Sequence, residues 1–251
     1  MKLNEATAVS TANTLLVPYD RRHVPTYHAW MEDPAIQQAT ASEPLTLDEE
    51  YENQESWRAS HDKLTFIICE PLPTSDSPAA ASSSSPSSSS SIKAGEHDAR
   101  ERMVGDVNLF LYPDEEEEED RPGVPRFCVG EVDIMIADAQ HRGRGLGREV
   151  VGTFLQYISR HRDRIMEEYA ADKDIDPPPR LKILMAKINE ANGRSISLFS
   201  ALGFEQEEGG ANYFGEVKLV LRNLDGFASQ NAPQVYRELV YSRDADTATT
   251  T

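Results

Sequence analysis

A glycine-rich stretch between residues 140 and 148 carries the clearest chemical signal in the sequence. Three glycines alternate there with larger residues, namely Gly143, Gly145 and Gly147. A glycine-rich loop that begins a helix exposes backbone N–H groups, and the helix dipole adds positive potential, so such a loop can bind a diphosphate. Three arginines place charge beside it, namely Arg142, Arg144 and Arg148. The stretch predicts an anion-binding loop, although similar patterns also occur in loops that only turn the chain.

Two familiar nucleotide-binding loops do not fit this stretch. A P-loop requires Lys and then Ser or Thr after its last glycine, whereas Gly147 is followed by Arg148 and Glu149. The order of the glycines also differs from the G-x-G-x-x-G of a Rossmann turn. Hydrolysis of a nucleoside triphosphate is therefore disfavoured.

A second polar segment follows the strand expected over residues 181–188. Asn192 and Ser195 begin an apolar helix that contains Phe199 and ends at Gly203, a good C-cap. With the glycine-rich loop, this segment resembles the GNAT acetyltransferase superfamily. The family signature R/Q-x-x-G-x-G/A matches residues 142–147, and a second register that starts at Gln140 also fits. The family's N-x-x-S motif, with the aromatic residue and the G-F pair that follow it, matches residues 192–204.

Several further blocks are similar to the N-acetyltransferase 9-like branch of this superfamily. They lie in one order along the chain, at residues 15–19, 24–31, 41–47, 103–110 and 142–147. The resemblance covers residues 14–221 apart from two insertions. The branch is described as acetylating protein N-termini, so the resemblance implies a protein or peptide substrate, with tubulin as the candidate partner.

The resemblance also implies a fold and a set of cofactor contacts. The fold would be the GNAT acyl-CoA N-acyltransferase fold of the α/β class, a central mixed β-sheet flanked by helices, with acetyl-CoA as co-substrate. The strand before the loop would separate from its neighbour, and the pantetheine arm would pair with the backbone of Met135, Ile136 and Ala137. Two further groups would contact the cofactor: Arg142, Gly143, Arg144, Gly145, Leu146, Gly147 and Arg148 at the diphosphate, and Asn192, Ser195 and Phe199 near the pantetheine.

The attacking amine must lose a proton before it reacts. An α-amine has a pKa of ~7.7–8.0 against ~10.4 for lysine, so its deprotonation at neutral pH needs about 3.4 kcal/mol less. Glu131 and Asp133 are the candidate bases, because period-two alternation places them on one face of a strand. Glu131 stands where several GNAT enzymes carry their base, but a solvated carboxylate at a strand end is the more common role for such a residue.

One position departs from the family pattern. Many relatives carry a tyrosine in the last helix that protonates the leaving thiolate, and here the position aligns with Phe199, which cannot donate. The acid is then water, Ser195 or Tyr213, or the thiolate leaves unassisted, since thiols have a pKa of ~8.5. The departure leaves a non-catalytic module that binds acetyl-CoA or tubulin as an alternative. Acetylation of lysine or of small-molecule amines is a second alternative.

The apolar patterns predict where strands and helices lie. Strands are expected over residues 14–19, 64–69, 103–111, 130–137, 181–188 and 213–221, and helices over 23–31, 46–57, 192–202 and a long stretch around 150–158. This order fits neither a doubly wound sheet nor a sandwich, and favours a mixed sheet flanked by helices.

The chain is expected to form one domain with insertions. The GNAT domain would span residues 14–222 and contain disordered insertions at 73–100 and 113–126, which hold a Ser-rich run and an acidic run. Residues 223–251 would be a partly disordered extension, frayed beyond Tyr241.

Composition limits the partners and the location. The 251 residues carry a formal net charge of -18, which repels phosphate backbones, so nucleic acid is not expected to bind. No apolar run reaches the ~18 residues of a membrane span, and no signal peptide is apparent. Two cysteines and widely spaced histidines predict neither a disulfide framework nor a metal site. We therefore expect a cytoplasmic protein that is a monomer or a weak dimer.

Overall fold

The computed structural model describes residues 1–73, 91–114, 127–231 and 235–243. Strands form one sheet in the order β4-β10-β1-β2-β3-β5-β6-β7-β9-β8. Their bounds are β1 Thr7–Ser10, β2 Leu15–Pro18, β3 Lys63–Cys69, β4 Ser91–Lys93, β5 Met103–Pro113, β6 Phe127–Ile136, β7 Arg180–Asn189, β8 Glu205–Gln206, β9 Glu216–Leu221 and β10 Arg237–Ser242. The helices are α1 Val24–Met31, α2 Pro34–Thr40, α3 Leu47–Ala59, α4 Leu146–Asp172, α5 Gly193–Ala201 and α6 Leu224–Gln230. Short 3-10 turns are η1 Arg21–His23, η3 Arg100–Arg102 and η4 Ala139–His141.

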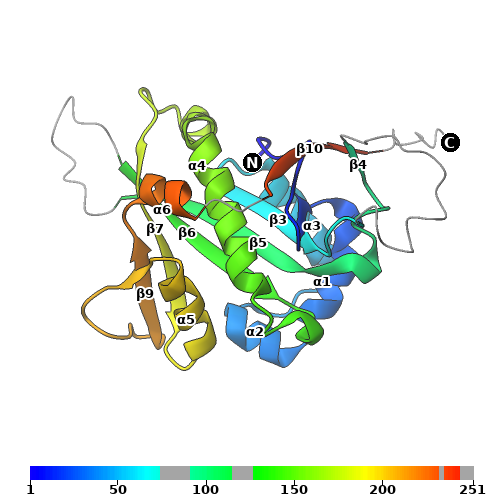
Figure 1. Ribbon diagram of the computed structural model, residues 1–251, viewed down its shortest axis with the longest axis horizontal. Coiled ribbons are helices and arrows are strands. Elements are labelled where there is room, and N and C mark those ends of the chain that lie inside the picture. Colours follow the sequence, from blue (N-terminus) through cyan, green and yellow to red (C-terminus); the bar gives the residue numbers. More distant parts are fainter. Residues whose placement is uncertain (74–90, 115–126, 232–234, 244–251) are drawn as a thin grey trace.

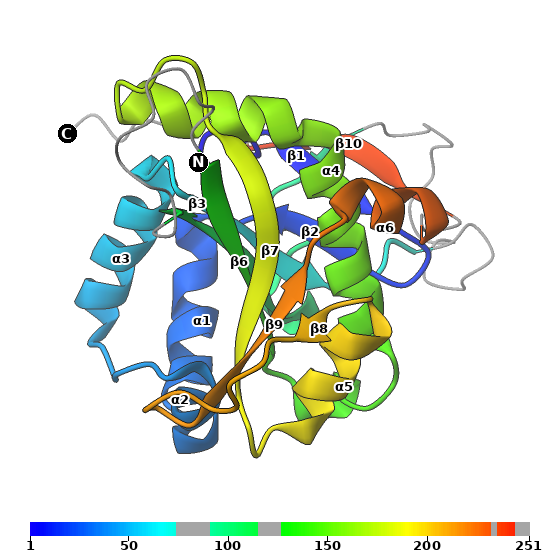
Figure 2. The same ribbon diagram turned by 90° about the vertical axis from the view of Figure 1, so that its left-hand side faces the viewer.

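The sheet is mixed, as the order of the predicted elements indicated. The pairs β6–β7 and β10–β4 are parallel, whereas the other neighbours run antiparallel. Helices α1, α2 and α3 cover one face of the sheet, and α4, α5 and α6 cover the other (Figures 1 and 2). The expected α/β class with a central mixed sheet flanked by helices is therefore confirmed.

Two apolar cores hold these layers together. The long helix α4 buries the stripe predicted from its sequence, including Val150, Phe154 and Ile158, each fully buried. Burial of each such side chain contributes roughly 1.5–3 kcal/mol. Phe66 of β3 packs edge-on against Phe154, so the centre of the sheet is fixed to α4. On the other face, α1 and η1 bury a second cluster against β2 and β3.

Local signals set the helix ends as expected. The Thr46 side chain accepts from the backbone N–H of Glu49, and the Glu49 side chain accepts from the Thr46 N–H, which is the capping box predicted for α3. These hydrogen bonds lower the pKa of Glu49. At the end of α5, Gly203 has a φ of +86°, the left-handed conformation that ends a helix.

The structure corrects the predicted boundaries of the domain. Residues 91–100, placed within a disordered insertion, include β4 and the buried Asp98. The C-terminal extension supplies α6 and β10, and β10 pairs with β1, a strand that begins before the predicted start of the domain. The strand expected from Tyr213 begins only at Glu216.

A buried hydrogen-bonded cluster joins these late and early segments. Asp98 accepts from Tyr241 Oη at 2.5 Å and from the Gly95 N–H at 2.5 Å, and it lies 2.8 Å from His23 Nε2. Three distant parts of the chain therefore meet at one carboxylate. Most of the Ser-rich run, residues 82–90, lies outside the described residues, as does the acidic run from 115 onward.

Two searches of the described residues bear on membranes and metals. None of the helices there combines the length and the apolar character needed to cross a membrane. In the same part of the chain, no three His, Cys, Asp or Glu side chains are grouped closely enough to hold a metal ion.

Candidate active site

The parallel strands β6 and β7 separate partway along their length. Their pairing ends at Glu131 and Met185, yet β6 stays paired with β5 as far as Ile136, and β7 stays paired with β9 as far as Asn189. Beyond Glu131, the facing edges of these strands are therefore not joined by a ladder. This is the separation that the family resemblance implied.

Only alternate residues of β6 turn their backbone groups toward this opening. The Ala137 N–H donates to the Val104 carbonyl at 2.9 Å, so it faces β5. The Met135 carbonyl also faces β5, since a Cβ on Gly105 would lie 1.9 Å from it. Because the backbone N–H and C=O groups of successive residues point to opposite sides of a strand, those of Ile134 and Ile136 point toward β7. Of the three residues expected to pair with pantetheine, only Ile136 therefore turns its backbone N–H toward the opening, and the pairing itself stays a prediction.

The glycine-rich loop has a backbone conformation that favours glycine. Gly143 and Gly145 have φ values of +74° and +82°, and a Cβ on either would meet no atom within 4 Å. The Glu149 N–H donates to the Gly145 carbonyl at 3.3 Å, as the first turn of α4 begins. The preceding N–H groups of the first turn have no acceptor within a helix. Gly147 instead permits close packing, because its Cβ would lie 2.6 Å from Leu198 of α5.

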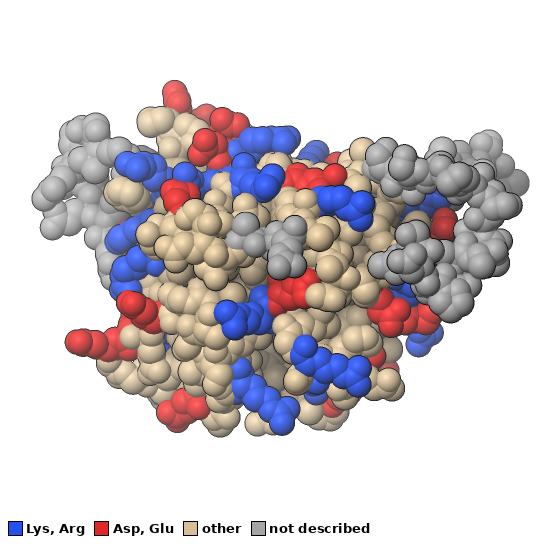
Figure 3. All heavy atoms as spheres, in the orientation of Figure 1, with Lys and Arg blue, Asp and Glu red and all other residues tan. Residues whose placement is uncertain are grey.

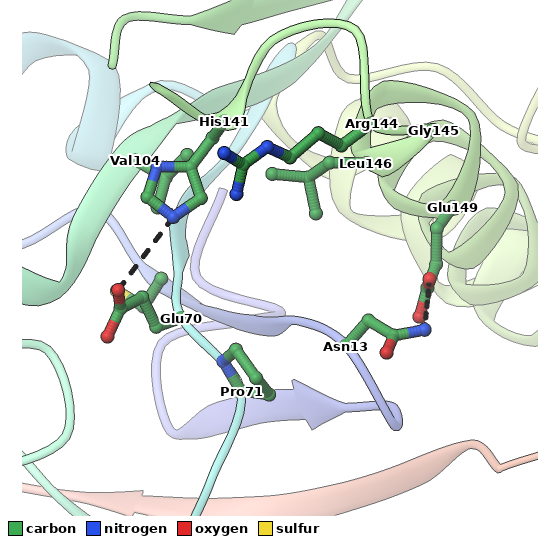
Figure 4. A pocket seen from close by; sticks show the side chains of 10 residues that line it. Asn13, Glu70, Pro71, Val104, His141, Arg144, Gly145, Leu146 and Glu149 are labelled. Carbon is green, nitrogen blue, oxygen red and sulfur yellow. Dashed lines mark hydrogen bonds and ion pairs between the residues drawn. The ribbon is translucent and has the colours of Figure 1, made fainter. Parts of the chain in front are cut away.

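The three arginines of the loop differ in their roles. Arg142 donates to the carbonyls of Ile136 at 2.7 Å and Ala137 at 2.9 Å, so it ties the loop to the end of β6. The Arg144 side chain extends into a cavity beside the loop (Figure 4). Arg148 lines a second cavity along α4. All three are exposed, and basic side chains gather over the start of α4 in Figure 3.

Two cavities flank the start of α4. The first, of about 450 Å³, lies between the loop and the ends of β3 and β5, and an ion pair of Glu70 with His141 at 3.7 Å borders it (Figure 4). The second, of about 410 Å³, lies between α4 and α6. Both share Asn13 and Glu149 in their linings.

The turn between β1 and β2 fixes Glu149 between these cavities. Thr11 Oγ1 donates to Glu149 Oε1 at 2.6 Å, and Asn13 Nδ2 donates to Glu149 Oε2 at 2.7 Å. The sequence analysis missed this contact, because nothing in residues 11–13 indicates a partner 136 or more positions away.

The two candidate bases lie on the sheet face that α1 and α3 cover. Glu131 forms an ion pair with Lys187, with Nζ and Oε2 2.8 Å apart. Asp133 forms no ion pair with a cation of the described residues. Burial, together with the negative charges of Glu131 and Asp106, raises the pKa of Asp133 to about 7. Its side chain is still partly exposed, so a substrate can reach it.

The other predicted residues divide into two groups. Asn192 Oδ1 accepts from the Ser195 N–H at 3.2 Å and caps α5, which leaves both residues partly exposed beside the opening. Phe199 is only 2% exposed and packs edge-on against Phe204. Its side chain belongs to the core, and its expected contact with the cofactor stays a prediction. Tyr213 is 96% exposed in the loop before β9.

Comparisons with known proteins agree with this geometry. The family model described as an acetyltransferase (GNAT) domain matches residues 13–205. The aminoglycoside acetyltransferase AAC(6')-Ib in complex with coenzyme A has a TM-score of 0.52 over 88% of this chain and 98% of its own, at 16% identity. The chain belongs to the GNAT acetyltransferase family and is an acetyltransferase.

The similarity to individual proteins is more specific. The N-acetyltransferase 9-like protein of Schizosaccharomyces pombe is 40% identical over 88% of this chain and 98% of its own length. The alpha/beta-tubulin-N-acetyltransferase 9 of Homo sapiens is 35% identical over 82% of this chain and 79% of its own length. The chain therefore belongs to the N-acetyltransferase 9-like branch.

Proposed function

We propose that this protein uses acetyl-CoA to acetylate the N-terminal α-amine of a protein, with Asp133 as the general base. The observation that carries the proposal is the place and state of Asp133. It is a partly exposed carboxyl with a pKa of about 7, two residues beyond the point where β6 and β7 separate.

The residues around the opening fit acetyl-CoA. Bound there, acetyl-CoA supplies the thioester whose acetyl group is transferred. The loop from Gly143 to Gly147 offers backbone N–H groups, a helix start and open space around two glycines, all of which favour a diphosphate. Arg144 adds a positive charge at the adjoining cavity. The backbone groups of Ile134 and the N–H of Ile136 provide the strand edge that an amide-containing arm can pair with, and an N–H there can stabilise negative charge on a thioester oxygen.

Asp133 is better suited than Glu131 to accept the proton of the amine. The Glu131 carboxylate is already engaged in an ion pair with Lys187. Asp133 has its pKa raised to about 7 by burial and by neighbouring carboxylates. A base works best when its pKa lies near the working pH. Of the two candidate bases, the proposal therefore assigns the role to Asp133.

Proton transfer to Asp133, with its pKa of about 7, is easier from an α-amine than from a lysine. Moving a proton from an α-ammonium with a pKa of ~8 to Asp133 is uphill by about 1.4 kcal/mol, whereas from lysine at ~10.4 it is uphill by about 4.6 kcal/mol. Relatives named alpha/beta-tubulin-N-acetyltransferase 9 support a tubulin-type substrate. The leaving thiolate needs no strong acid, and a water molecule can protonate it, so Phe199 is compatible with turnover.

The proposal is tested with peptides whose reactive amines are controlled. Peptides with a tubulin N-terminus are offered either with a free α-amine or with that amine blocked and an internal lysine present. We expect acetylation of the first only, and a loss of at least about 100-fold in kcat for Asp133→Asn. Acetyl-CoA binding, measured by calorimetry, should persist in this variant. Transfer only to lysines or small amines would overturn the substrate, and no transfer by the native protein to any amine would favour a binding module.

A further inference from the structure

A layer of polar side chains lies under α1, on the sheet face that carries Asp133. Thr65, Asn108 and Asp133 are direct cross-strand partners on β3, β5 and β6. In the next row, Asp106 stands between Ile67 and Met135. Tyr27 of α1, Glu50 of α3 and Tyr19 after β2 cover these rows. We call this set the polar layer; its members are Tyr19, Tyr27, Glu50, Thr65, Asp106, Asn108 and Asp133.

Several members of the polar layer lack a partner in the protein. In the described part of the chain, Tyr19 Oη, Glu50 Oε2, Thr65 Oγ1 and Asn108 Oδ1 are buried without a hydrogen-bond partner. Buried polar atoms are almost always satisfied, and where protein groups do not serve, ordered water does. A cluster of such atoms therefore marks a polar layer within the second core.

Asp106 is the acid at the centre of this layer. Its side chain is 1% exposed. Asn108 Nδ2 donates to Asp106 Oδ2 at 2.8 Å, and Tyr27 Oη donates to the same oxygen at 3.4 Å. Asp106 and Asp133 are diagonal cross-strand neighbours, a position in which Cα atoms lie roughly 7–8 Å apart and side chains on one face interact. No cation is paired with Asp106 among the ion pairs of the described residues.

We propose that Asp106 is a positioning residue for acetyl transfer: it is the buried, diagonal cross-strand neighbour of the partly exposed Asp133, and its charge makes Asp133 the stronger base toward the acceptor amine. The inference rests on the proposed function of Asp133. A negative charge next to a carboxylate disfavours its ionised form, which strengthens its hold on a proton. The two groups then titrate as a pair.

The surrounding charges are consistent with this role. Glu131 on the same strand and Glu216 on β9 act on Asp133 in the same direction as Asp106, whereas Lys187 on β7 opposes them. Burial raises the pKa of Asp106 itself to about 6 against the hydrogen bonds from Asn108 and Tyr27. Asp106 is therefore ionised over much of the range in which Asp133 takes up a proton. Glu50 and Asp106 both act on Tyr19, and neither Tyr19 nor Glu50 contributes a positive charge.

The test compares Asp106→Asn with a control of equal charge change. Asp225→Asn removes one carboxylate from the exposed start of α6, where Asp225 pairs with Arg162. For Asp106→Asn, we expect the acidic limb of the kcat/KM profile to move to lower pH by about one unit, and the plateau to fall about threefold to tenfold. Asp106→Glu should restore the limb. Asp225→Asn should leave both unchanged, and acetyl-CoA binding should be retained throughout.

A merely structural role predicts a different result. Loss of packing would lower kcat/KM equally at every pH, and an acidic limb that stays in place in Asp106→Asn overturns the inference. If Asp106→Asn does not melt cooperatively, Tyr27→Phe takes its place. It removes the hydroxyl that stabilises the Asp106 charge and should move the limb the same way by less. Carboxyl NMR titration of the free protein follows Asp133 without catalysis. It therefore decides between pairing and no pairing even if the native protein acetylates no amine.

Discussion

Replacing Asp133 with asparagine should remove activity and, at alkaline pH, stabilise the folded protein. Burial and the carboxylates of Glu131 and Asp106 hold the pKa of Asp133 at about 7 in the fold, against its ordinary value of 3.8. When folding raises the pKa of a carboxyl group, ionisation of that group lowers the stability of the folded state. Asparagine keeps the shape of the side chain without that charge.

The sign and size of the effect follow from proton linkage. Between pH 4 and 7 the folded protein binds more protons at this site than the unfolded chain, so stability falls as pH rises through this range. Below about pH 4, both states are protonated and the penalty is absent. Above about pH 7 it is complete, and the shift of about three units corresponds to at most about 4 kcal/mol. Partial exposure of Asp133 reduces this figure.

Urea unfolding of both proteins at pH 5 and pH 8 measures the effect. We expect Asp133→Asn to gain stability over the native protein on going from pH 5 to pH 8, by about 1–3 kcal/mol after allowance for exposure. Asp138→Asn is the contrasting control, because a hydrogen bond from the Gln140 N–H lowers the pKa of Asp138 and its loss should destabilise instead. An equal effect of Asp133→Asn at both pH values would refute a strained, proton-accepting carboxylate at this position.

Two further outcomes test the loop and the buried cluster. Gly145→Ala and Gly209→Ala both place a side chain at positive φ, +82° and +119° respectively. Each variant should therefore lose about 1–2 kcal/mol of folding stability. Calorimetry should show weaker acetyl-CoA binding only for Gly145→Ala. Equal affinities in the two variants would contradict the anion-binding role of the loop. Burial alone would raise the pKa of Asp98, but hydrogen bonds from His23 and Tyr241 outweigh it and lower the pKa to about 2. Asp98 therefore contributes about 2 kcal/mol above pH 4 that is lost as pH falls toward 2, a dependence that thermal melts of Asp98→Asn should lack.

The sequence indicated the elements with strong local patterns. The apolar stripe of α4, the capping box of Thr46 and Glu49 and the glycine that ends α5 are all found where they were expected. Each of these signals arises from contacts within a few residues. The glycine alternation is of the same kind, because positive φ at Gly143 and Gly145 is a local property.

Features that depend on distant partners were missed or misassigned. Three residues of β4 after a Ser-rich run carry no pattern of their own, and only pairing with β10 makes them a strand. Arg142 and Arg144 look alike in sequence, yet one binds backbone carbonyls and the other lines a cavity. Strand alternation, applied to residues 134–137, would have favoured Ile134 and Ile136 over three consecutive residues.

The elements outside the predicted domain also affect the site. Strand β10 pairs with β1, and Asp98 fixes its neighbourhood through Tyr241. The turn after β1 supplies Thr11 and Asn13, which hold the carboxylate of Glu149 in the first turn of α4. An acid in that turn would repel a diphosphate at the loop. The carboxylate oxygens of Glu149 accept hydrogen bonds from Thr11 and Asn13. These donors balance part of the negative charge of Glu149 and fix the orientation of its side chain. Truncation of the C-terminal strand should therefore weaken binding at a loop it does not touch.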